Sequence, residues 1–410
     1  MKQRQLTPEQ KRAQNRVQIQ KRRFVIYRAI TFLILGFLVI GILWSVFQKD
    51  KTYSETENRV LAGKPELSLS SLSSGQYMSD MESYITDQFF FRNQWIKLKT
   101  TEDLAVGKRE SNGVYIGKNQ NLLEIQDDYD KDNVTKTAKA ISDFADKHET
   151  LNQTMTLVPN AGYICDQLRP NNAPVHDQSK DIALVKENLG DNITYFDLTE
   201  TMKSHKKEQI YYKTDHHWTS LGAKYAFEAL APQLKITDVP SEYTVYPVTH
   251  SFQGTLSSKS GYTRAEDTIE VYIPKDGAPD TLVNYTEQGE KTASIYHSAA
   301  LKQKDKYEVF FGGNYARIDI DTPTSPDRNL LIFKDSYANC MIQFLQPYFR
   351  TITMIDARYY YDDVDRVISD RNITDILYLY NVNTFMTDTS LADVLSDAGA
   401  EAEGSLADAK

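Results

Sequence analysis

Cysteine and histidine are scarce in this sequence, and their scarcity limits the kinds of site that the chain can form. Among 410 residues there are two cysteines, Cys165 and Cys340, and seven histidines. No CxxC spacing occurs, and no clustered set of His and Cys suggests a zinc site. The two cysteines either form one disulfide or are two small buried apolar side chains, and the sequence leaves both possibilities open. These residues therefore predict no zinc site, and nothing else in the sequence suggests a soluble cofactor.

The first 28 residues are strongly basic, whereas the rest of the chain carries more acidic than basic residues. The basic segment carries nine Lys and Arg against a single acidic residue, Glu9, which gives a net charge of +8. The whole chain has a net charge of -9, so the remainder carries -17. A body this acidic lacks the basic face that neutralises phosphates, so a nucleic-acid-binding function is not expected.

Long apolar runs are absent except for one, residues 24–47, in which Arg28 is the only charged residue. At about 1.5 Å per residue this run is long enough to span a bilayer core of about 30 Å. A signal peptide usually has an apolar region of about 7–15 residues and a small-residue cleavage site, and this run has neither feature. The run predicts an uncleaved membrane anchor. Because Lys and Arg precede it, we expect a cytoplasmic N-terminus and an extracellular C-terminal domain in the cell membrane.

The segments after the anchor indicate one large α/β domain. From residue 133, helical and strand-like segments alternate, which is typical of βαβ units and a mostly parallel sheet. Residues 235–325 interrupt the alternation with short β-like runs and are predicted to form a β-rich insertion. The expected organisation is a basic cytoplasmic tail, an anchor, a tether, an ectodomain and a flexible tail, at residues 1–23, 24–47, 48–75, 76–398 and 399–410.

The first candidate for a chemical site is the sequence TDHHWTSLGA, in which Asp215, His216 and His217 precede a predicted helix. Thr219 is placed to cap the N-terminus of that helix. In a bent segment, Asp215 can accept a hydrogen bond from Nδ1 of a nearby imidazole and leave Nε2 facing a reacting hydroxyl, which is the geometry of a general base. The alternatives are a metal site, because this spacing also suits metal ligands, and a hydrogen-bonded structural turn.

The second candidate is NLLIFKDSYAN, in which an apolar strand leads to Ser336 at the start of a predicted helix. In α/β folds, ligands bind at the carboxyl ends of parallel strands, and backbone N–H groups at a helix N-terminus can bind an oxyanion. Ser336 is therefore a candidate nucleophile. The alternative is a buried serine with a structural role only.

Together these motifs resemble those of a known family. The sequences ENRVLAGKPE, DQFFFRNQW, TDHHWTSLGA, FQGTLSSKSG, VFFGGNYARI and LLIFKDSYAN follow one another in this order, and over roughly residues 55–385 the chain resembles the bacterial DHHW proteins. These are related to the AlgX and AlgJ proteins of alginate O-acetylation and to SGNH-type esterases. The resemblance implies an SGNH-like three-layer domain. It also implies that Ser336 is the nucleophile, His217 the general base and Asp215 the carboxylate that orients it.

The resemblance implies further residues around this triad. In SGNH enzymes the backbone N–H of the serine shares the oxyanion hole with an Asn or Gly from another loop, and Gly313 and Asn314 are the candidates here. His216 is expected to lie beside the catalytic histidine, and His216 and Lys334 are further candidates for binding the oxyanion or the substrate. The chain departs from the usual SGNH pattern at Lys334, where those enzymes have glycine. It also departs in placing the Asp/His motif before the serine, a feature shared with the alginate relatives.

The function expected from the resemblance is O-acetyl transfer to a cell-surface or exported polysaccharide. The implied partner is a membrane-bound O-acyltransferase (MBOAT) that supplies acetyl groups across the bilayer. Two alternatives stay open. One is an acetylesterase or deacetylase that uses the same three residues with water as the acceptor. The other is a non-catalytic polysaccharide-binding protein of the cell envelope, in which these residues are structural.

Overall fold

The computed structural model describes residues 7–54, 59–324 and 327–396, and these fall into two compact units. The first unit comprises Met1–Ser54 and Arg59–Trp95, and the second comprises Glu55–Asn58 and Ile96–Lys410. The flexible tail predicted at residues 399–410 lies outside the described residues. We treat the two units separately.

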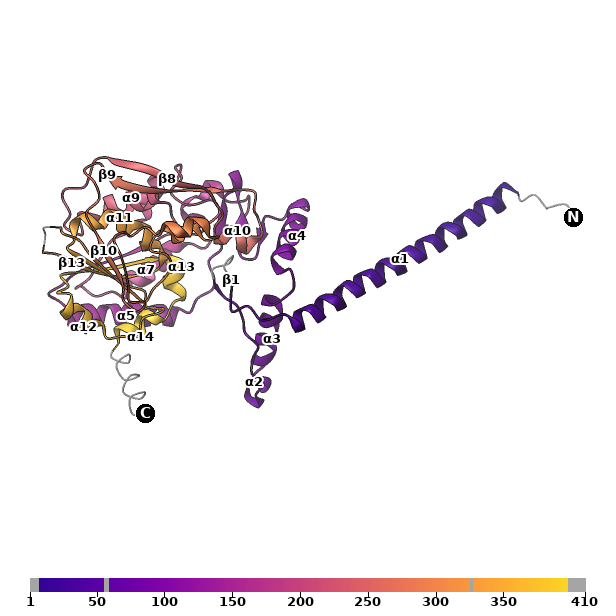
Figure 1. The fold of residues 1–410 in the computed structure, drawn as a ribbon, viewed down its shortest axis with the longest axis horizontal. Helices are drawn as coiled ribbons and strands as arrows, with labels where there is room; N and C mark the ends of the chain where they lie inside the picture. The colour runs from indigo at the N-terminus through magenta and orange to yellow at the C-terminus, as the bar shows by residue number, and fades with distance from the viewer. Residues whose placement is uncertain (1–6, 55–58, 325–326, 397–410) are drawn as a thin grey trace. The chain divides into compact units, whose positions relative to one another are not determined.

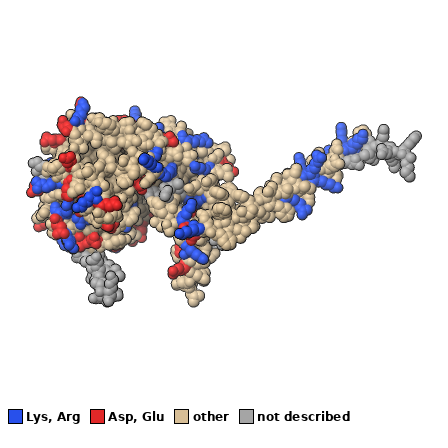
Figure 2. All heavy atoms as spheres, viewed as in Figure 1, with Lys and Arg blue, Asp and Glu red and all other residues tan. Residues whose placement is uncertain are grey.

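The first unit begins with one long helix, α1, at Pro8–Phe47. It starts well inside the predicted basic tail, because no proline or glycine interrupts residues 9–35. Within α1, Asn15–Ser45 is long and apolar enough to cross a membrane and is almost entirely exposed. Lys and Arg gather toward the N-terminal end of this helix, while the rest of its surface is uncharged (Figure 2).

The remainder of the first unit consists of short elements, the first of which lie in the predicted tether. After the tether come two helices, separated at residues 88–91, where Phe91 has a positive φ of 52°. The last of these helices continues into the second unit. The elements are β1 (Tyr53–Ser54), β2 (Arg59–Val60), α2 (Leu69–Ser73), α3 (Gln76–Asp87) and α4 (Arg92–Ala105).

The second unit is built on an eight-stranded sheet with the order β11-β10-β12-β14-β13-β15-β6-β7 (Figure 1). Neighbouring strands from β14 to β7 are parallel, and those from β11 to β14 are antiparallel. The mostly parallel sheet of the prediction is therefore confirmed. The strands are β6 (Asn152–Val158), β7 (Thr194–Tyr195), β10 (Leu282–Tyr285), β11 (Glu290–Thr292), β12 (Arg317–Asp321), β13 (Asn329–Lys334), β14 (Thr351–Ile355) and β15 (Asp375–Asn381).

Helices cover both faces of this sheet, which confirms the three-layer α/β architecture (Figure 1). Leu330 and Ile332 on β13 belong to one apolar cluster, and the alternating Leu331 and Phe333 belong to another on the opposite face. A strand buried on both faces is continuously apolar, and this explains the run NLLIF. The α-helices are α5 (Lys131–Lys147), α6 (Ala161–Ile164), α7 (Gln178–Glu187), α8 (Thr199–Ser204), α9 (Ser220–Leu230), α10 (Thr255–Ser260), α11 (Ile342–Leu345), α12 (Val364–Asp370), α13 (Val382–Thr387) and α14 (Ser390–Leu395).

The region predicted as a β-rich insertion, residues 235–325, is antiparallel but does not form one separate module. Its first hairpin, β8 (Tyr243–Phe252) with β9 (Asp267–Pro274), is a two-stranded sheet of its own. Its other strands, β10, β11 and β12, extend the edge of the central sheet. Residues 113–124 form a hairpin within a small antiparallel sheet of β3 (Glu110–Ser111), β4 (Val114–Ile116) and β5 (Leu122–Glu124).

Both cysteines are free and buried. Burial raises the pKa of each thiol to about 12. Of the two possibilities left open by the sequence, the structure shows two small buried side chains, Cys165 and Cys340, and no disulfide between them.

Candidate active site

Ser336 lies directly after the central strand β13. The strand ends at Lys334, and Asp335 caps a short 3-10 helix, η5 (Ser336–Met341), by accepting a hydrogen bond from the N–H of Tyr337 at 2.9 Å. The other Asp335 oxygen accepts from the N–H of Asn381, at the end of β15, at 2.8 Å. Burial raises the pKa of Asp335. The serine is therefore fixed by two neighbouring strands, while its own side chain stays partly exposed.

The Asp-His-His segment is a turn held in place by a third carboxylate. Asp267, on β9, accepts hydrogen bonds from the N–H groups of Lys213 at 2.9 Å and Thr214 at 2.8 Å, and from the Thr214 hydroxyl at 2.6 Å. After the turn, the Thr219 hydroxyl accepts from the N–H of Gly222, which confirms Thr219 as the N-cap of α9. The turn is thus supported from both ends.

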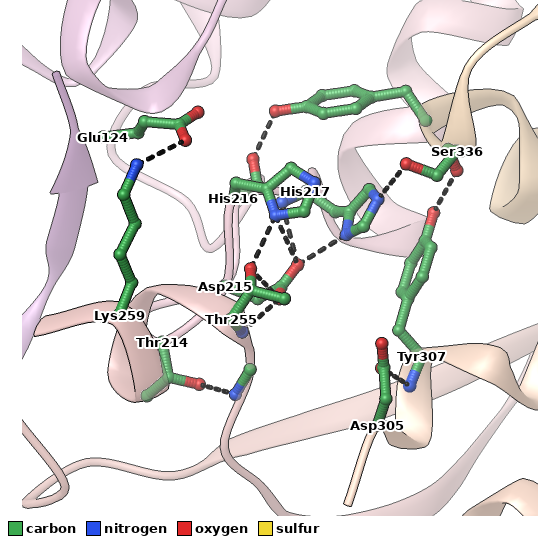
Figure 3. Close-up of polar contacts among 12 residues, drawn as sticks. Glu124, Thr214, Asp215, His216, His217, Thr255, Lys259, Asp305, Tyr307 and Ser336 are labelled. Atoms are coloured by element: carbon green, nitrogen blue, oxygen red, sulfur yellow. Dashed lines mark hydrogen bonds and ion pairs between the residues drawn. The ribbon is translucent and has the colours of Figure 1, made fainter. Parts of the chain in front are cut away.

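The structure brings Ser336, His217 and Asp215 into one hydrogen-bonded chain (Figure 3). Ser336 Oγ lies 2.7 Å from His217 Nε2, and His217 Nδ1 lies 2.5 Å from Asp215 Oδ1. The imidazole and the carboxylate are buried. A serine, an imidazole and a carboxylate linked in this way have the arrangement in which the imidazole can take the hydroxyl proton and the carboxylate fixes its tautomer.

Asp215 accepts four hydrogen bonds. Oδ1 accepts from the N–H and Nδ1 of His217, and Oδ2 accepts from the N–H and the hydroxyl of Thr255 at 2.8 and 3.0 Å. Gly254 allows this close approach, because a Cβ at that position would lie 2.3 Å from Asp215 Oδ2. Burial opposes ionisation of Asp215, but the charges of His216 and His217 together with these hydrogen bonds hold its pKa well below the usual range.

The imidazole of His217 is held neutral and in a fixed plane. Burial, reinforced by the nearby charge of His216, lowers the pKa of His217 to about 4, although Asp215 opposes the shift. The ring of Tyr307 stacks on that of His217, with centroids 3.8 Å apart and planes 12° apart. The Tyr307 hydroxyl also donates to the carbonyl oxygen of Ser336 at 3.0 Å. Tyr307 therefore fixes the imidazole and the serine backbone together.

His216 lies beside His217 and is the more exposed of the two. Its Nδ1 lies 2.7 Å from the Thr255 hydroxyl, and its carbonyl oxygen accepts a hydrogen bond from the Tyr337 hydroxyl. The indole of Trp218 donates to the carbonyl oxygen of Tyr337 at 2.8 Å. Three consecutive residues, at positions 216–218, therefore contact the serine turn, which is formed by Ser336 and Tyr337.

Lys334 lies next to the serine in the chain but is not accessible to a substrate. It is buried, with Nζ 3.1 Å from Asn339 Oδ1 and 3.5 Å from Asp356 Oδ2. Asp356 is also held by Arg358 through Nε and Nη2, at 2.8 and 2.6 Å. Burial lowers the pKa of Lys334, and Asp356 opposes this shift. The lysine that departs from the SGNH pattern thus belongs to a paired, buried charge network.

Gly313 and Asn314, expected near the oxyanion, have no hydrogen bond to Ser336 within the described residues. Gly313 has a φ of 142°, and a Cβ there would reach Glu308 and Tyr315. Asn314 is exposed. The structure therefore gives no contact that links either residue to the serine, and their assignment stays a prediction.

Asp215, His216 and His217 also satisfy the spacing of a metal site, since each offers a ligand atom within 4.8 Å of the others. Both nitrogens of His217 are engaged, however, one by Asp215 and one by Ser336. The Nδ1 of His216 faces Thr255. A cation bound by all three would have to break the hydrogen bonds that join them to the serine. The arrangement fits a serine nucleophile better than a metal centre.

Several residues that build this site were not assigned by the sequence. Thr255 and Gly254 lie in the motif FQGT, which marked the family but carried no role. Tyr307, Asp267 and Asp356 gave no local signal, because each acts across a distance of about 20 to 90 residues in the chain.

Comparison with known proteins identifies the family of the chain. A family model described as DHHW protein matches residues 147–355. A DHHW family protein from Eubacterium siraeum is 25% identical with a TM-score of 0.59, covering 70% of this chain and 95% of that one. Bacillus cereus PatB1 with a sulfonyl adduct is 22% identical with a TM-score of 0.57, covering 67% and 96%. No match was found among curated proteins. Since the family model covers just over half of the sequence, the chain belongs to the DHHW family.

Proposed function

We propose that this protein is a serine-dependent O-acetyltransferase that acts on a cell-surface or exported polysaccharide. The observation that carries the proposal is the hydrogen-bonded chain from Ser336 through His217 to Asp215. The match to the DHHW family supports it, as does the sequence resemblance to the AlgX and AlgJ proteins.

In the first half-reaction, Ser336 takes an acetyl group from an ester or thioester donor. His217 Nε2 accepts the hydroxyl proton while Oγ forms a bond to the acetyl carbon. The bond from that carbon to the donor's oxygen or sulfur then breaks, and His217 returns the proton to the departing atom. Because its pKa is lowered to about 4, His217 is unprotonated near neutral pH and can act as the base.

In the second half-reaction, a sugar hydroxyl attacks the acetyl-serine. Its oxygen bonds to the acetyl carbon, His217 takes its proton, the bond to Ser336 Oγ breaks, and the proton passes to that oxygen. With water as the acceptor the same steps make an acetylesterase. The choice between the two depends on how the site binds the acceptor.

The proposed location is the outer face of the cell membrane. Helix α1 is long and apolar enough to span a bilayer, and Lys and Arg gather toward its N-terminal end (Figure 2). By the positive-inside rule this end stays in the cytoplasm and the second unit lies outside. An acetyl donor in the cytoplasm then requires a transporting partner, for which we propose a membrane-bound O-acyltransferase.

Intact-mass analysis of the detergent-solubilised full-length protein tests the chemistry. After incubation with p-nitrophenyl acetate, the wild-type protein should gain an acetyl group of about 42 Da on a serine. The Ser336→Ala and His217→Ala variants should not. An aryl sulfonyl fluoride is a second probe, suggested by the adduct on PatB1.

The outcome separates the proposal from its rivals. An acetyl-enzyme that needs both residues supports the acyl-transfer chemistry, and its release by sugar rather than water distinguishes a transferase from an esterase. A folded wild-type protein that neither gains the adduct nor turns over the ester contradicts the proposal and favours a polysaccharide-binding role.

A further inference from the structure

His216 is the part of the Asp-His-His turn that a ligand can reach. Its side chain is 28% exposed, whereas those of His217 and Asp215 are 5% and 2% exposed. Its ring lies against that of His217, with centroids 3.9 Å apart, so it borders the site where the acetyl group would be carried.

The hydrogen bonds around Thr255 fix the tautomer of His216. Asp215 Oδ2 can only accept, so the single hydroxyl proton of Thr255 is donated to it at 3.0 Å. The Thr255 oxygen, 2.7 Å from His216 Nδ1, must then accept, and Nδ1 carries a proton. In the neutral ring this leaves Nε2, on the side away from Thr255, as an unprotonated hydrogen-bond acceptor. No other described residue bonds to it.

A cation and a carboxylate lie on the same flank of the site. Lys259 Nζ and Glu124 Oε1 are 3.8 Å apart, and Figure 3 shows the pair on the side of His216 that faces away from Ser336 and Tyr307. Both side chains are partly exposed, at 39% and 24%. This side of the site therefore offers a fixed imidazole acceptor and, farther out, an ammonium donor and a carboxylate whose other oxygen accepts from Asn383 at 3.1 Å. Neighbouring hydroxyl groups of a sugar, each a donor and an acceptor, suit this combination.

We propose that His216, with Lys259 and Glu124, forms the acceptor subsite and binds a hydroxyl adjacent to the one that is acetylated. The inference rests on the proposed function and adds a role for each residue. His217 takes the proton of the attacking hydroxyl. His216 Nε2 accepts a hydrogen bond from the adjacent hydroxyl of the sugar and is not itself protonated in the step. The subsite thus favours a vicinal diol over water or a simple alcohol.

The test compares acceptors on the acetyl-enzyme of the full-length protein in detergent. Ser336 is acetylated with p-nitrophenyl acetate, and transfer is measured to methyl glucoside, which has vicinal hydroxyls, and to methanol, which has one. In His216→Phe we expect transfer to the glucoside, relative to hydrolysis, to fall about tenfold, the factor that corresponds to one hydrogen bond. Transfer to methanol, which has no neighbouring hydroxyl for His216 to bind, should stay within about twofold. Lys259→Met should lower transfer to the glucoside in the same selective way.

His250 provides a matched control, because its Nδ1 also faces a threonine hydroxyl, that of Thr268, at 3.1 Å on the β8–β9 hairpin. His250→Phe should leave all three rates unchanged. If His216→Phe leaves the ratio of glucoside transfer to hydrolysis unchanged, or lowers transfer to glucoside and methanol equally, this inference is overturned. The proposed function is not affected by either result. A loss of acetylation in that variant also overturns the inference, since His216 would then act through Thr255 and Asp215. Absence of an acetyl-enzyme in the wild-type protein overturns the proposed function together with this inference.

Discussion

Replacing Gly254 with alanine should disable the site by displacing Asp215. Gly254 has φ -81° and ψ -166°, a conformation open to any residue, so the change introduces no backbone strain. The added Cβ, however, would lie 2.3 Å from both Cβ and Oδ2 of Asp215. Carbon and oxygen atoms rarely approach within about 3.4 Å, so one of the two groups must move by about 1 Å.

The size of the effect follows from this displacement. A shift of about 1 Å in a catalytic group can lower the rate about 100-fold, which corresponds to about 2.7 kcal/mol in the activation free energy. Overpacking of a buried site lowers the free energy of unfolding by about 1–3 kcal/mol, so the protein should still fold. We expect Gly254→Ala to react with p-nitrophenyl acetate about 100-fold more slowly, with a modestly lower melting temperature.

The assay combines kinetics of p-nitrophenol release with thermal unfolding, and Gly63→Ala is the control because no atom lies within 4 Å of a Cβ built there. In an Asp215→Asn background the glycine substitution should have little further effect on the rate, since both changes act on one carboxylate. A folded Gly254→Ala protein that reacts within threefold of the wild-type rate would refute the role given to Asp215.

Three further outcomes are expected. Because the pKa of His217 is lowered to about 4 and only the unprotonated ring is a base, the acetylation rate should be flat near neutral pH and fall as pH drops through about 4; an inflection above pH 6 contradicts this. Lys334→Met should lower the free energy of unfolding by about 1–3 kcal/mol in urea, because Asp356 loses a buried partner; unchanged stability argues against the network. Chelators should leave ester turnover unchanged, and a loss restored by zinc would revive the metal alternative.

The sequence was sufficient to predict the fold where local pattern decides structure. The continuous apolar run at Leu330–Phe333 predicts a strand buried on both faces, and β13 is the central strand that this requires. The alternation of helices and strands predicts the parallel sheet, because βαβ units pair their strands in parallel. The sequence could not show that β10, β11 and β12 join that sheet at its edge, because pairing between distant strands has no local signature.

Only the residues of the candidate site that lie within the family motifs could be assigned a role from the sequence. The motifs assign Asp215, His217 and Ser336 to one site, and the structure places these residues in contact. The supporting residues were out of reach, because Thr255 lies 40 residues from the carboxylate it binds, and Tyr307 lies 29 residues from the serine it holds. Lys334 could be noted only as a departure from the SGNH pattern, since the buried Asp356 that accounts for it lies on another strand end.

The order of the chain also determines how the two halves of the site are supported. Ser336 follows a strand that is paired on both sides, by β14 and β15, so its position depends on the most buried part of the sheet. Asp215 and His217 lie on a turn held by side chains, among them Asp267 and Thr255. Loss of a side-chain contact moves the turn without unfolding the sheet. Substitutions that weaken the turn's supports should therefore lower activity more than stability, whereas cavities in β13 should lower stability first.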